Sequence, residues 1–161
     1  MKILNWIAEL CAILAGLLLT AITLITCYNL LLRNTTGGDM VGAFELTAMA
    51  TGVAIALFMP LSQARQGHII VDFFTSKCSD SVNGFLDRIG ALMLALVFTF
   101  VGWRTAVGGL SAYESDSQTM LMGLPEWIVY AGMVPGFAIT AVIALVQVAT
   151  GFEAKNEEVN A

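Results

Sequence analysis

The fold is decided by the stretch Leu10–Leu32, which reads LCAILAGLLLTAITLITCYNLLL and contains 23 residues without a charged side chain. At a rise of ~1.5 Å per residue, a helix of this length crosses the ~30 Å hydrocarbon core of a bilayer. Further uncharged runs occupy 46–64, 89–103 and 127–152, and the third continues as apolar sequence to Leu110. Because a soluble core helix would carry charges every few residues, the pattern predicts an all-α integral membrane protein with four transmembrane helices. We expect one membrane domain with spans at about 7–32, 43–64, 86–110 and 127–150 and a cytoplasmic tail at 151–161.

The composition supports this class and excludes others. Of the 161 residues, 58% are hydrophobic and 12% are charged, whereas soluble domains carry about 25% charged residues. The net charge of −5 and the absence of a basic stripe exclude nucleic acid as a partner. A cleaved signal peptide is disfavoured because the first apolar stretch is too long and Glu9 interrupts its start.

The basic residues predict the orientation of the chain. With a cytoplasmic N-terminus, five of them lie inside the cell and only two, Arg33 and Arg104, lie outside. Aromatic residues agree, since Trp6 falls at the inner interface and Trp127 at the outer one. The sequence therefore predicts that both termini are cytoplasmic.

The third span contains a geometric conflict. Arg88 and Arg104 are separated by ~24 Å along a helix, which is less than the ~30 Å hydrocarbon core. We expect one or both side chains to snorkel to the headgroups. In the alternative, Arg104 pairs with an acid or an anion at the outer surface.

Catalytic and metal chemistry are not indicated. Cys11 and Cys27 lie ~24 Å apart on one predicted helix and cannot form a disulfide, and the sequence has no C-x-x-C motif. His68 is the only histidine, and no acidic or histidine cluster has the spacing of metal ligands. The sequence predicts that the chain is not an enzyme and that it binds no cofactor or metal.

Small residues recur every four positions in the second and fourth spans, at Ala48, Gly52 and Ala56 and at Gly132 and Gly136. Such stripes let helix backbones approach closely in lipid. They predict packing within a four-helix bundle or, alternatively, docking onto a second membrane protein.

The charged residues near the membrane surfaces form two groups. On the outside, Arg33 ends the first span and Glu45 opens the second, and we expect them to form an interfacial ion pair that fixes helix packing. On the inside, the segment that follows Arg65 predicts a short helix on the membrane surface, in which His68 and Asp72 are four residues apart and can hydrogen-bond.

Four segments resemble the small membrane subunit (DctQ) of the tripartite ATP-independent periplasmic (TRAP) transporter family. They are Glu45–Leu46 at the start of an apolar helix, Gly67–Asp72 (GHIIVD), Leu124–Tyr130 (LPEWIVY) and Val134–Gly136 (VPG). The chain departs from the family pattern at Phe44, where tryptophan is frequent. The resemblance covers essentially the whole chain in length, number of spans and orientation.

The resemblance implies a function that composition alone does not. Such a subunit partners a large multi-span transport subunit and a soluble periplasmic binding protein in the bacterial inner membrane. The complex imports an organic acid anion with a sodium gradient, and the substrate and sodium sites lie in the large subunit. The small subunit is then a fixed scaffold against which the large subunit moves like an elevator.

The outer loop before the fourth span is a candidate docking surface for the binding protein. It carries Glu114, Asp116 and Glu126 and no basic residue, and charges of this kind steer association. Two other functions remain open. A proton-coupled exporter would need an acid deep in a span, for which Glu9 is the only candidate, and a membrane assembly or sensory protein would have no transport role.

Overall fold

In the computed structural model, the described residues are 2–65 and 80–150, and they form four long helices. These are α1 (Lys2–Thr36), α2 (Ala43–Ala64), α4 (Asp80–Glu114) and α5 (Trp127–Thr150). All four are long and apolar enough to cross a membrane, so the prediction of an all-α protein with four membrane-spanning helices is confirmed. The predicted short surface helix, with His68 and Asp72, lies outside the described residues.

The helices differ from the predicted spans mainly in length. α2 and α5 have the bounds expected for the second and fourth spans, whereas α1 and α4 each contain 35 residues. A helix of that length measures ~52 Å, so both extend beyond a ~30 Å hydrocarbon core or cross it at a tilt. α2 also continues for four residues past Pro60, which is buried inside the helix.

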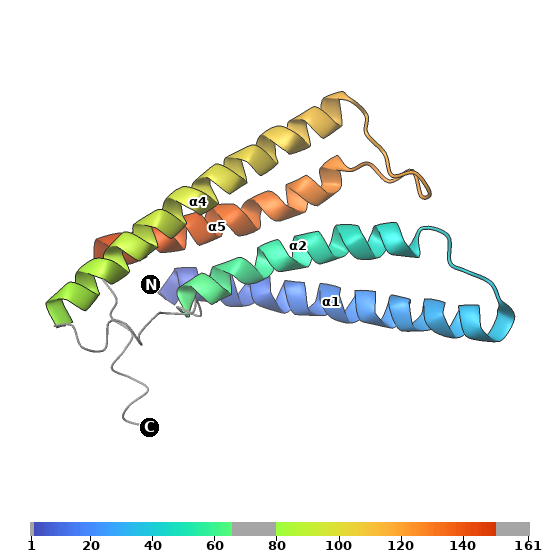
Figure 1. The fold of residues 1–161 in the computed structure, drawn as a ribbon, viewed down its shortest axis with the longest axis horizontal. Coiled ribbons are helices and arrows are strands. Elements are labelled where there is room, and N and C mark those ends of the chain that lie inside the picture. The colour runs from blue at the N-terminus through green and yellow to red at the C-terminus, as the bar shows by residue number, and fades with distance from the viewer. Residues whose placement is uncertain (1, 66–79, 151–161) are drawn as a thin grey trace, which may run out of the picture.

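The four helices form an open layer in the order α1, α2, α5, α4, with α1 and α4 at its two edges (Figure 1). α2 packs along α1 on one side and α5 on the other, while α4 packs along α5. No extensive contact joins α1 to α4 among the described residues, so the four helices pack side by side and do not close into a ring. The α1–α2 and α4–α5 connections share one end of the layer, which we call the outer end, following the predicted orientation (Figure 1).

Small side chains bring the paired helices together. On α1 the buried residues Ala8, Ala12 and Ala15 are spaced three to four positions apart, as one face of a helix requires. On α4, Gly109 faces the Cβ atom of Tyr130 so closely that an added methyl group would lie 2.8 Å from it. Close backbone approach therefore replaces large interlocking side chains at these contacts, as is usual in membrane helices.

Candidate functional site

The seam between α2 and α5 is the point where the two halves of the layer meet. Gly136 is buried against the backbone carbonyl group of Ala56, and an added Cβ at Gly136 would clash with that carbonyl oxygen. One turn earlier, Gly132 faces Val53, whose Cγ1 atom would lie 3.0 Å from an added Cβ. The two small-residue stripes thus face each other within this chain.

Two further members of the predicted stripe behave differently. Gly52 has room for a methyl group, since the nearest atom, the Sδ of Met133, would be 3.8 Å away. Ala48 is exposed and does not contribute to the buried seam. The close approach of the two backbones is therefore confined to the middle of α2.

The buried side-chain amides of Gln63 and Gln147 hydrogen-bond at the inner end of the seam between α2 and α5. Gln63 Nε2 donates to Gln147 Oε1 at 2.7 Å, and Gln147 Nε2 donates to the backbone oxygen of Gln63 at 2.9 Å. Both side chains are at least 96% buried between α2 and α5. Because a polar group in an apolar layer requires a partner, these two bonds select the register in which the two glutamines meet.

The loop between α4 and α5 folds into a small hairpin at the outer end. Gln118 and Pro125 form an isolated antiparallel bridge, and Thr119 N donates to the oxygen of Leu124 at 2.9 Å. The tip of the hairpin is apolar and open, with Met120 98% exposed. The loop is therefore an ordered projection from the layer.

Glu45 anchors this hairpin to α2. Its Oε1 accepts a hydrogen bond from Leu121 N at 2.9 Å and its Oε2 one from Met122 N at 3.1 Å. Both donors are backbone amides at a turn, so the carboxylate satisfies two groups that the hairpin itself leaves unpaired. Glu45 lies in the first turn of α2, where a negative charge also suits the helix dipole.

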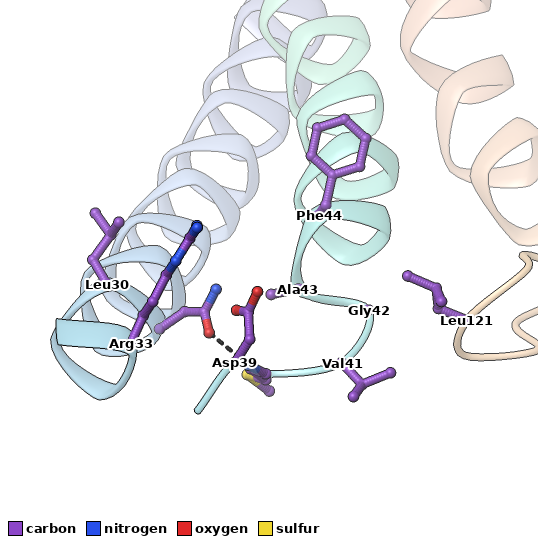
Figure 2. A pocket seen from close by; sticks show the side chains of 10 residues that line it. Leu30, Arg33, Asp39, Val41, Gly42, Ala43, Phe44 and Leu121 are labelled. Atoms are coloured by element: carbon purple, nitrogen blue, oxygen red, sulfur yellow. Dashed lines mark hydrogen bonds between the residues drawn. The ribbon is translucent and has the colours of Figure 1, made fainter. Parts of the chain in front are cut away.

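The predicted ion pair between Arg33 and Glu45 is wrong. No ion pair joins them in the described residues, because both carboxylate oxygens face the α4–α5 loop. Arg33 instead lines a half-open cavity of about 390 Å³ between the end of α1 and the start of α2. Figure 2 shows Arg33 and Asp39 on the α1 side of this cavity and Leu121 facing it from the opposite side.

The other predicted charged residues are dispersed. Arg65 caps the end of α2 through its backbone amide, and the exposed Arg88 lies toward the opposite end of α4 from Glu114. Glu114 is the last residue of α4, and Asp116 follows in a left-handed conformation with φ of 49°. Both are exposed, whereas Glu126 is half-buried. The acidic loop residues remain candidates for docking.

Replacing Glu45 with alanine should release the hairpin from α2. The amides of Leu121 and Met122 would lose their acceptors, and the tip would move independently of the layer. We expect limited proteolysis within 117–123 to become several-fold faster, while Arg33→Ala leaves the rate unchanged. Equal acceleration by both substitutions would contradict the assignment of Glu45 as the anchor.

The described structure thus defines a multi-pass membrane protein whose buried polar residues serve helix packing and whose Glu45 anchors the outer loop. No group of three histidine, cysteine or acidic side chains that could hold a metal occurs among its described residues. The family model of the DctQ component of tripartite ATP-independent periplasmic transporters matches residues 22–154. The chain belongs to this family, which is a family of transporter components and not a class of enzymes. No curated protein and no solved structure matches the chain.

Proposed function

We propose that this chain is the scaffold subunit of a sodium-driven transporter of the bacterial inner membrane that imports an organic acid anion. In this proposal it supports a large, elevator-type transport subunit and works with a periplasmic binding protein. The observation that carries the proposal is the family membership together with the kind of polar residue found inside the layer. The buried polar residues of the described chain are Gln63, Thr140 and Gln147, all of them uncharged.

These buried groups are engaged in holding the helices. The two glutamines bind each other across the seam, and the Thr140 hydroxyl donates to the oxygen of Gly136 at 2.7 Å. A transport site for an anion or for sodium would require converging polar groups near mid-membrane, commonly at broken helices. The four described helices are continuous, which favours a fixed support over a moving carrier.

The outer loop suits a contact with the soluble binding protein. Glu114 and Asp116 are exposed on it, and the anchor at Glu45 holds the hairpin in place beside them. We propose that Glu114, Asp116 and Glu126 face a basic patch on the binding protein. Rim charges of this kind change the association rate more than the strength of the final complex.

Reconstitution of the three components in proteoliposomes tests the proposal. The small subunit alone should move no substrate, and the large subunit with binding protein should require it for full uptake. With all components present, Glu114→Lys combined with Asp116→Lys should slow uptake several-fold at limiting binding protein, and the effect should shrink at high ionic strength. Sodium-dependent uptake by the isolated small subunit would contradict the scaffold role. Uptake that is independent of this chain would favour the assembly or sensory alternative.

A further inference from the structure

Arg104 is the one charged residue on an apolar face that α4 turns away from the rest of the described chain. Positions 93, 97, 100, 104, 107 and 111 lie on one side of the helix at spacings of three and four residues. All six are exposed, and besides Arg104 and Ser111 they are Met93, Val97, Phe100 and Val107. The opposite side of α4 packs on α5 through residues that include Gly102 and Gly109.

The contacts between α4 and α5 fix the depth of Arg104. Gly109 lies level with Tyr130, and Gly102 lies level with Phe137, so Arg104 falls between these two levels. Because α5 begins at Trp127, a rise of ~1.5 Å per residue places Arg104 ~12 Å inward from that residue. If Trp127 marks the outer interface, Arg104 lies near the middle of a ~30 Å hydrocarbon core.

At this depth snorkelling does not resolve the conflict between the ~24 Å separation of Arg88 and Arg104 and the ~30 Å hydrocarbon core. The Cα–Cβ bonds of a helix tilt toward its N-terminus, which for α4 is the inner end. The Arg104 side chain therefore starts toward the more distant membrane surface. A charge at this level is costly in lipid and is normally paired with a group of opposite charge.

The described chain offers no counter-charge at this level. α5, the helix that packs along α4, contains no acidic residue between Trp127 and Thr150. Among the described residues, no hydrogen bond or ion pair engages the Arg104 side chain. Within the described residues, Arg104 is therefore left without a counter-charge at this depth.

We propose that Arg104 forms an ion pair within the membrane with an aspartate or glutamate on a transmembrane helix of the large transport subunit. The inference rests on the proposed function and adds the docking face and the charge that directs it. The apolar residues around Arg104 fit an apolar helix with one acidic residue at the same depth. Removal of water from such a pair makes it a strong determinant of specificity.

Co-purification of the large subunit with tagged variants of this chain tests the proposal in the intact complex. Arg104→Gln removes the charge, and we expect the affinity for the large subunit, and with it the recovery, to fall by about thirtyfold or more, the scale for removing one partner of a buried charge pair. Arg104→Lys keeps the charge and should restore most of the recovery. Arg33→Gln is the matched control, since it removes one positive charge from the outer end of α1 and should leave recovery unchanged.

A photo-crosslinking residue in place of Phe100, one turn from Arg104, provides a second readout without charge removal. We expect it to form a covalent product with the large subunit. Attachment to lipid alone, or equal recovery for Arg104→Gln and the unaltered chain, would overturn the docking face. If the unaltered chain recovers no large subunit, both the proposed function and the docking face fail. If the unaltered chain recovers the large subunit and Arg104→Gln recovers it equally well, only the docking face fails.

Discussion

Replacing Gly136 with alanine should separate α2 from α5 and destabilise the protein by about 1–3 kcal/mol. The added methyl group would meet the carbonyl oxygen of Ala56, a backbone atom that cannot move aside as a flexible side chain can. Leucine at the same position should be worse, because its whole side chain would have to enter the seam. The measurement is the thermal unfolding midpoint of the purified complex in detergent.

Gly52→Ala is the matched control for this experiment. Both glycines lie inside helices, so alanine improves helix propensity by about 1 kcal/mol at either position. At Gly52 the new methyl group makes only ordinary van der Waals contact with Met133. We therefore expect Gly52→Ala to be neutral or stabilising. Equal effects of the two substitutions would contradict the close backbone approach at Gly136.

Replacing Gln147 with leucine should cost about 1–2 kcal/mol, the scale measured for hydrogen bonds between membrane helices in model peptides. The substitution removes both bonds that Gln147 makes with Gln63 and leaves buried polar atoms of Gln63 without those partners. The unfolding midpoint of the complex again reports the loss. Gln118→Leu is the control, because Gln118 is exposed in the outer hairpin.

The double variant separates the amide pair from general disruption. When Gln63 and Gln147 are both replaced with leucine, two apolar side chains face each other across the seam. Neither side-chain amide is then left buried without its hydrogen-bond partner. The combined loss should therefore be smaller than the sum of the two single losses. Strict additivity would show that the two amides act independently, contrary to the geometry of the seam.

The helices themselves were predictable because the relevant physics is local. A bilayer requires each span to satisfy its own backbone, so a long run without charge is sufficient evidence for a helix. The two stripes that contain Ala56 on α2 and Gly136 on α5 were also predictable, since small residues at intervals of four serve close packing. The buried residues Ala8, Ala12 and Ala15 of α1 carry a similar signal, at intervals of four and three.

The contacts between distant segments were not predictable from spacing. Glu45 and Arg33 are close in sequence and opposite in charge, yet the carboxylate binds backbone amides some 76 positions away. Backbone amides carry no sequence signature, so nothing identified the hairpin as the partner of Glu45. The hydrogen-bonded pair of Gln63 and Gln147 was not predicted for a related reason. A single glutamine near the end of a membrane-spanning helix looks like an ordinary polar residue at the membrane interface.

The open layer has a mechanical consequence. Because α2 and α5 form the main contact between its two halves, any relative motion of the halves must take place about that line. Three contacts lie along this seam. They are Glu45 with the outer hairpin, Ala56 with Gly136, and Gln63 with Gln147. From Glu45 to Gln63 they extend over ~27 Å of helix, so they oppose both splaying and sliding. The four helices should therefore move as one rigid unit in the bilayer, without hinge motion between the two halves.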